Sequence, residues 1–271
     1  MAPIAVIWGA LRYEYRMQIR RVSVWVVLGL IILVVFGLWY GDSDLLYGYH
    51  TLPEAGQPSR WVPPDPHLSL LYWTQFMAMF VPLGIGLVLA DRLARDSRLR
   101  VDELFDGAPG SAAARLAGKF AGSTLATLTP IFIIYFGLVV YMMQQTGTAA
   151  LLPPALALFA AVILPGSLFV AGFSISLPVI LRVPVYQFLF TGYWFWANLM
   201  SPKIGIPSIV GTMLNAAGPW AQEGIFRFHW TFLKLNATPV EGLLSIALLV
   251  GLGLVATFGM LGYLHWRSLG R

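Results

Sequence analysis

Long runs of apolar residues dominate the chain and alternate with short polar segments. A helix that rises 1.5 Å per residue needs about 20 consecutive apolar residues to cross a bilayer core of about 30 Å. None of the apolar runs shows the apolar–polar alternation of a membrane β-barrel strand. The sequence therefore predicts an all-α integral membrane protein with one transmembrane domain over 1–271 and six transmembrane helices, spans 1 to 6, at 22–40, 68–90, 120–143, 151–174, 179–200 and 242–266.

The composition excludes a water-soluble enzyme. Hydrophobic residues make up 58% of the 271 residues and charged residues only 11%, whereas a soluble domain carries about 25% charged residues. The chain contains no cysteine, which excludes disulfides, thiol catalysis and cysteine-ligated metal sites. A net charge of +5 is typical of a membrane protein with arginines on its cytoplasmic side, so we expect no nucleic-acid partner.

The first 21 residues repeat apolar and basic side chains at helical spacing. The apolar face consists of Ile4, Ile7, Trp8, Leu11, Tyr15 and Ile19. Arg12, Arg16 and Arg20 lie off that face. The pattern predicts an N-terminal amphipathic interfacial helix that lies along the surface of the lipid bilayer. A plain charged helix leading into span 1 fits the same pattern.

The distribution of basic residues predicts the orientation. Of the 17 Lys and Arg residues, 13 fall in the N-terminal segment, the connections between spans 2 and 3 and between spans 4 and 5, and the C-terminal tail. Because cytoplasmic segments are enriched in Lys and Arg, both termini are expected to be cytoplasmic. Segments 41–67 and 201–241 are then outer loops.

The centres of the six spans contain no Asp, Glu, Lys, Arg or His. Proton relays and voltage sensors depend on such residues inside the membrane. The four His residues are scattered without the spacing of metal ligands. We therefore expect no catalytic residues, no metal site and no cofactor bound by this chain, and we expect its energy source to lie outside it.

Spans 2 and 5 carry neutral polar and aromatic side chains. The candidates for a substrate path are Gln75, Met79, Tyr186, Gln187, Tyr193 and Asn198. Aromatic walls with a few hydrogen-bonding groups suit an amphiphilic substrate. Helix packing and an aromatic belt at the membrane interface explain the same residues. Gly118 and Gly122 form a GxxxG pair that favours close helix packing, and Ser111 can cap a helix that runs into span 3.

The connection between spans 2 and 3, residues 91–119, is the most informative loop. Asp102 and Glu103 favour the start of a short helix, which carries Leu104 and Phe105 and is ended by the Gly- and Pro-containing turn 107–110. Two large apolar side chains among charges favour docking into a groove of a cytoplasmic partner. They could instead pack back on the bundle or on the membrane surface.

These features resemble the membrane-spanning subunit of ATP-binding cassette (ABC) type-2 exporters. The resemblance lies in the helix ALRYEYRMQIRR before span 1, in six spans over the whole chain, and in the loop ending DELFDGAPGSAAARLAGK. That loop has the family's acidic residue, hydrophobic pair, proline and Gly-Lys at Glu103, Leu104 with Phe105, Pro109, and Gly118 with Lys119. Gly110 departs from the pattern, since the family often has an aliphatic residue there.

The resemblance implies a permease that dimerises with a second copy or with a homologous permease. Two copies of a cytoplasmic ABC ATPase subunit would hold the ATP and Mg, since this chain has no GxxxxGK[ST] motif. The resemblance also assigns a short cytoplasmic coupling helix between spans 2 and 3, formed by Arg98, Arg100, Asp102, Glu103, Leu104 and Phe105. The N-terminal helix would contact the same ATPase.

Further expectations follow from the resemblance. Spans 2 and 5 would line the path between protomers, and the loop Met200–Glu241 would carry short re-entrant helices. The function implied is outward export of a hydrophobic or amphiphilic substrate across the cell membrane, in a family that is chiefly bacterial. A self-sufficient transporter or channel and a membrane scaffold subunit of a larger assembly remain the alternatives.

Overall fold

The computed structural model describes residues 3–41, 49–50, 61–62, 65–93, 95, 111–147, 149–200, 205–230 and 233–269. Five helical segments in this part of the chain are long and apolar enough to cross a membrane. They are α2 (Val22–Gly41), α4 (Pro66–Leu89), α7 (Ala112–Thr146), the segment Leu152–Val179, and α12 (Pro239–Leu269). The protein is therefore a membrane-embedded helical protein, as the apolar runs predict.

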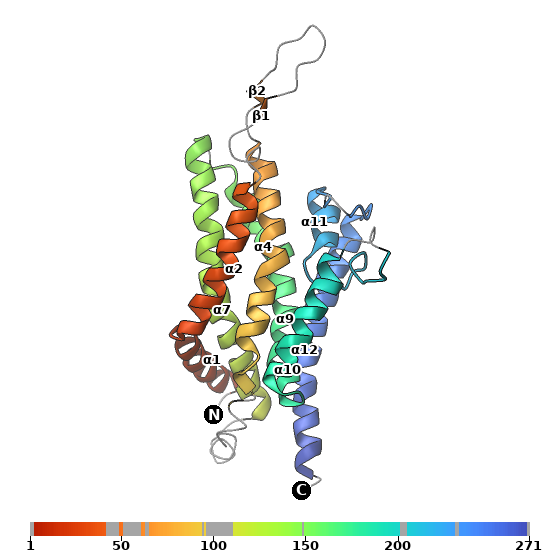
Figure 1. Ribbon diagram of the computed structural model, residues 1–271. Coiled ribbons are helices and arrows are strands. Elements are labelled where there is room, and N and C mark those ends of the chain that lie inside the picture. Colours follow the sequence, from red (N-terminus) through yellow and green to blue (C-terminus); the bar gives the residue numbers. More distant parts are fainter. Residues whose placement is uncertain are drawn as a thin grey trace.

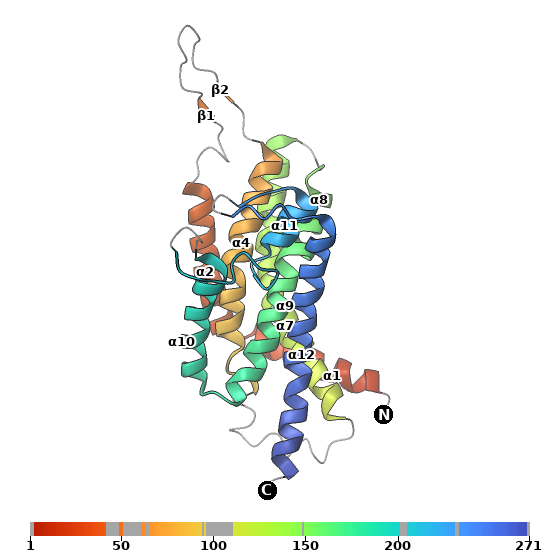
Figure 2. The ribbon, with the colours of Figure 1, turned by 90° about the vertical axis from the view of Figure 1, so that its right-hand side faces the viewer.

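The helices form one elongated bundle with two distinct ends (Figures 1 and 2). Both chain termini lie at one end, and α1 (Pro3–Ile19) lies there across the foot of the bundle. At the opposite end, β1 (Tyr49–His50) pairs antiparallel with β2 (Trp61–Val62), with Tyr49 opposite Val62. The short helix α11 (Pro219–Phe226) lies towards that end as well, within the predicted outer loop 201–241.

Two helices begin at side-chain caps that the local sequence supplies. Asp65 is extended, and its carboxylate accepts a hydrogen bond from the backbone N–H of His67 at 2.9 Å, before α4. Ser111 is also extended, and its Oγ accepts from the N–H of Ala114 at 3.2 Å, before α7. The predicted cap at Ser111 is confirmed, and α7 begins well before residue 120 because the cap starts the helix outside the apolar run.

The fourth predicted span is not one regular helix. It consists of α8 (Leu152–Leu158), the π-helix η1 (Phe159–Ile163) and α9 (Leu164–Ser176), followed by the 3-10 turn η2 (Leu177–Val179). The backbone N–H of Leu164 bonds to the carbonyl of Phe159, five residues earlier. Pro165 has no N–H and collides with a regular preceding turn, which explains the wider turn at this point.

The fifth predicted span is shorter than its apolar run. Arg182 is extended (φ −68°, ψ 139°), and α10 begins only at Val183 and ends at Trp194. The π-helix η3 (Phe195–Leu199) continues it, and Met200 leaves helical geometry (ψ 117°). The late start follows from Pro178 and Pro184, which interrupt the helical hydrogen bonds between α9 and α10. This segment is not among the five long enough to count as a span.

Aromatic side chains fill the centre of the bundle. Trp39 of α2 meets Trp73 of α4 edge to face at 5.8 Å between ring centroids, and Trp73 stacks on Tyr135 of α7 at 6.5 Å. The Tyr135 hydroxyl lies 2.9 Å from the Thr74 hydroxyl, so its polar end is satisfied within the core. Three helices distant in sequence are thereby held together.

Candidate functional site

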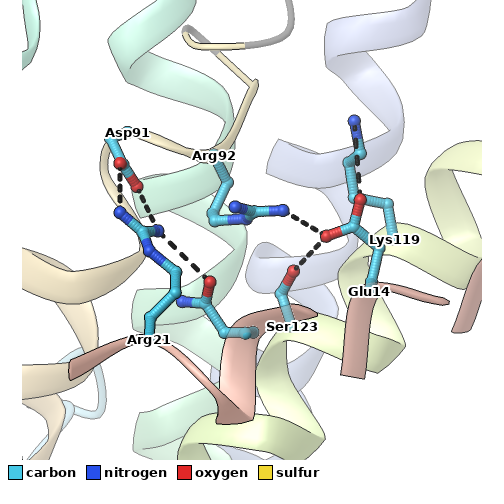
Figure 3. Close-up of polar contacts among 7 residues, drawn as sticks. Glu14, Arg21, Asp91, Arg92, Lys119 and Ser123 are labelled. Atoms are coloured by element: carbon cyan, nitrogen blue, oxygen red, sulfur yellow. Dashed lines mark hydrogen bonds and ion pairs between the residues drawn. The ribbon is translucent and has the colours of Figure 1, made fainter. Parts of the chain in front are cut away.

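A buried ion pair lies at the end of the bundle that carries both termini. Glu14 of α1 pairs with Arg92, which follows α4, and their side chains are only 6% and 1% exposed. Lys119 of α7 places its Nζ 4.0 Å from the other Glu14 oxygen, and Ser123 Oγ donates to Glu14 at 3.4 Å. Figure 3 shows these side chains converging on the one carboxylate. Glu14 therefore joins α1 to the end of α4 and to the beginning of α7.

A second ion pair reinforces this junction. Arg21, between α1 and α2, donates two hydrogen bonds to the Asp91 carboxylate at 2.9 and 2.6 Å, and a third to Gln18 Oε1 at 3.2 Å (Figure 3). Burial raises the pKa of Asp91, but the hydrogen bond and charge of Arg21 outweigh it and leave this pKa below its usual value. The hydrogen bond to Asp91 raises the pKa of Arg21. Both groups are therefore ionised at neutral pH.

We call the two pairs together, with Lys119 and Ser123, the α1 junction. The sequence patterns do not single out Glu14, Arg21, Asp91 or Arg92 as candidate residues. One signal was available, because Glu14 is the one acidic residue among the first 41. A single carboxylate among four arginines, one turn from apolar neighbours, is a reasonable candidate for a buried partner.

Gly118 and Gly122 let α1 approach α7 closely. A Cβ on Gly118 would lie 2.5 Å from the Ile7 carbonyl oxygen, and one on Gly122 would lie 2.4 Å from the Leu11 carbonyl oxygen. The predicted GxxxG pair therefore contacts the N-terminal helix in this structure. The short separation between the two backbones is what brings Glu14 within reach of Ser123.

Replacing Gly118 or Gly122 with alanine is expected to lower the free energy of unfolding by about 1–2 kcal/mol, because the added Cβ meets backbone rather than a movable side chain. Thermal unfolding of the purified protein in detergent micelles measures the effect. Gly137→Ala in the same helix is the matched control, since its Cβ has no neighbour within 4 Å. Equal stability of Gly122→Ala and Gly137→Ala would show that α1 is not held closely.

The residues predicted for the interfacial helix are partly exposed and partly packed against α7. Trp8 is 64% exposed, Leu11 and Tyr15 are half-buried, and the Tyr15 hydroxyl lies 3.2 Å from Thr129 Oγ1. The three predicted arginines are exposed; they are Arg12, Arg16 and Arg20. The side of α1 that packs on the bundle carries Glu14 and Gln18, so its most buried positions are polar.

Two of the predicted path residues connect α10 to its neighbours. The Tyr186 hydroxyl hydrogen-bonds with Ser174 Oγ of α9 at 2.7 Å. Gln187 Nε2 donates to the Leu87 carbonyl of α4 at 3.0 Å. Each of the two side chains has a hydrogen-bond partner on a neighbouring helix. The helix-packing alternative therefore accounts for their contacts.

The other predicted path residues lie nearer the opposite end. Asn198 is buried and accepts from the N–H of Ala216 at 2.8 Å, which fixes the segment before α11. Gln75 is also buried, with Nε2 at 3.9 Å from the sulfur of Met79, but its Oε1 has no partner in the described part of the chain. Tyr193 is half-buried beside Trp196. Gln75 is thus the path candidate whose hydrogen-bonding capacity remains open.

The predicted coupling residues lie outside the described residues; they are Arg98, Arg100, Asp102, Glu103, Leu104 and Phe105. Among the residues that the structure describes, no group of three or more His, Asp or Glu side chains could hold a metal ion. No protein-family model matches the chain, and no curated protein matches it. The chain's own residues therefore have to indicate its function.

Proposed function

We propose that the chain is the membrane-spanning permease subunit of an ABC-type exporter, which moves a hydrophobic or amphiphilic substrate outward with ATP hydrolysed by a separate ATPase subunit. The α1 junction is the observation that carries the proposal. Arg92 and Lys119 lie on either side of segment 96–110, and both meet Glu14 of α1. If a docked ATPase displaced that segment, the buried Glu14 carboxylate would transmit the movement to α1, α4 and α7.

The proposed topology has six spans with both termini in the cytoplasm. It takes α10 and η3 together as the fifth of these spans, at the lower limit of about 17 residues that crosses a bilayer. Both termini lie at the end of the bundle that carries the α1 junction (Figure 1). The excess of basic residues in the segments assigned to that end supports its cytoplasmic placement.

The distribution of charge supports an external energy source. In the described parts of the candidate spans, Arg115 and Lys119 lie near the start of α7, Glu241 lies near the start of α12 and Arg267 lies near its end. The polar side chains deeper in the spans, such as Thr74 and Tyr135, are neutral and bonded to each other. An ion-driven transporter would need ionisable groups at such depths.

The proposed substrate path runs between two permease copies along α4 and α10. The outer surface of α10 is apolar, with Phe188 79% and Leu189 52% exposed. Such a surface suits lipid or a second copy of the chain. Gln75 Oε1, which has no hydrogen-bond partner among the described residues, supplies an acceptor for an amphiphilic cargo.

Replacing Leu104 and Phe105 together with Asp is expected to abolish co-purification of the ATPase from native membranes and to abolish transport, while the protein stays in the membrane. Charged side chains would not enter an apolar groove on the partner. A mild-detergent pull-down of the tagged chain, with the ATPase quantified, measures the loss. The matched variant Leu104→Met/Phe105→Leu keeps both side chains apolar and is expected to retain the ATPase.

Three results would argue against the proposal. Wild-type ATPase recovery in the Asp variant would remove the docking role of the loop. Transport by the purified chain in liposomes, without ATP or partner, would identify a self-sufficient transporter. Stable partner binding without any solute movement would identify a scaffold.

A further inference from the structure

Three arginines follow one side of α1 and point away from the bundle. Arg12, Arg16 and Arg20 are four residues apart, so they form a stripe along the helix, and all three are exposed. They line an open groove of about 740 Å³ together with Gly9, Tyr13 and Met17. None of the three forms an ion pair with a carboxylate among the described residues. We call these three residues the arginine stripe.

Two exposed apolar side chains extend the arginine stripe towards the N-terminus of α1. Ile4 is 79% exposed and Trp8 is 64% exposed, and they lie two turns and one turn before Arg12 in the same i, i+4 row. The helix itself lies across the foot of the bundle, at the end that carries both termini (Figures 1 and 2). A helix that exposes both apolar and guanidinium side chains suits the boundary between lipid tails and phosphate headgroups.

We propose that the arginine stripe binds the headgroups of anionic phospholipids. Guanidinium groups form paired hydrogen bonds with phosphate oxygens. Three positive charges without an ion-pair partner among the described residues favour a lipid of net negative charge over a zwitterionic lipid, whose own ammonium group repels arginine. The inference needs only the membrane embedding of the chain and does not depend on an ATPase partner.

The α1 junction fixes the orientation that this binding requires. Glu14 and Arg16 are two residues apart on the helix, so they project to nearly opposite sides. Glu14 is held by Arg92 and Lys119, and Arg21 is held by Asp91. Rotation of α1 about its axis would break these pairs. The ion pairs therefore hold the arginine stripe facing outward. This preorganisation lowers the entropic cost of lipid binding.

The test measures which lipids the full chain retains. The protein is equilibrated in micelles with equal parts of phosphatidylglycerol and phosphatidylcholine, washed, and its bound lipids are quantified by mass spectrometry. Wild type is expected to be enriched in phosphatidylglycerol. Because each basic residue at an anionic surface contributes roughly fivefold in affinity, Arg12→Gln/Arg16→Gln/Arg20→Gln is expected to lower the preference at least about tenfold.

Two control variants isolate the cause. Arg12→Lys/Arg16→Lys/Arg20→Lys retains the charge and is expected to keep most of the preference. Arg227→Gln/Lys234→Gln removes two exposed charges in the predicted outer loop, near α11, and is expected to leave the preference unchanged. Thermal unfolding in phosphatidylcholine alone checks that the Gln variant is folded, which is expected because all three substituted side chains are exposed.

Four outcomes would overturn the inference. An unchanged lipid preference in the Gln variant would remove the role of the stripe, and an equal loss in the Arg227/Lys234 variant would indicate a general charge effect. Displacement of phosphatidylglycerol by millimolar inorganic phosphate would indicate a free-anion site. Loss of ATPase recovery with unchanged lipid preference would indicate that a protein covers the stripe. Failure of the Leu104/Phe105 test would leave the lipid result intact, so the two proposals fail separately.

Discussion

Replacing Glu14 with alanine is expected to lower the free energy of unfolding by about 3–5 kcal/mol, the usual consequence of removing one partner from a buried ion pair. Arg92 is then left 1% exposed without its counter-charge, and Lys119 loses the carboxylate that lies 4.0 Å away. Among the described residues, no other carboxylate forms an ion pair with Arg92. The measurement is thermal or denaturant unfolding of the purified protein in micelles.

Two further variants separate the cost of an unpaired charge from the cost of a smaller side chain. Asp91→Asn removes a pair whose side chains are 22% and 34% exposed, so water can solvate the remaining Arg21, and a loss of at most about 1 kcal/mol is expected. Glu14→Gln/Arg92→Met removes both buried charges and is expected to recover most of the stability. Equal stability of Glu14→Ala and Asp91→Asn would contradict the conclusion that the Glu14–Arg92 pair is buried.

The same comparison bears on coupling. The Glu14→Gln/Arg92→Met variant keeps the fold but loses the charge that joins α1 to both sides of segment 96–110. Under the proposed function, such a protein would retain its ATPase yet transmit its motion less well. This variant therefore separates the effect of the α1 junction on stability from its effect on transmitting ATPase motion. A substitution that simply unfolds the chain could not separate them.

The long helices were predictable because their signal is local. The apolar run that begins at Val22 predicts the start of α2. Ser111 predicts the start of α7 because it is the N-cap residue immediately before that helix. The interruption at η1 and the short α10 depend on how prolines are accommodated. Pro165 is tolerated by a π turn, whereas Pro178 and Pro184 separate two helices. The sequence marks these prolines without deciding between the two outcomes.

The α1 junction was not predictable because its partners are distant in sequence. Glu14 and Arg92 are 78 positions apart, and each sits among charges that a helical pattern assigns to a solvated face. The sequence shows which polar side chains the predicted path contains, but it does not show what they contact. Tyr186 and Gln187 bond to Ser174 and to the Leu87 carbonyl, contacts that require knowledge of how α10 packs on α9 and α4.

Replacing Gly172 with alanine is expected to lower the free energy of unfolding by about 3 kcal/mol, at the upper end of the usual effect of overpacking. A Cβ on Gly172 of α9 would lie 2.2 Å from the Gly253 carbonyl oxygen of α12, and one on Gly253 would lie 2.7 Å from the Leu168 carbonyl oxygen. That Gly253 carbonyl also accepts a hydrogen bond from Thr257 Oγ1 at 2.9 Å, so it is held in place. The obstacle is backbone on both sides.

Gly251→Ala is the matched control, because it lies two residues from Gly253 on the other side of α12 and its Cβ would meet nothing within 4 Å. Its stability is expected to be unchanged or slightly raised, since alanine favours a helix over glycine. Unfolding in micelles compares the two variants directly. If Gly172→Ala were as stable as Gly251→Ala, α9 and α12 would be free to separate. A clear difference would show that α9 and α12 are closely packed at this contact, so we expect a rearrangement of the bundle to occur at other helix contacts, such as those of α10 or α1.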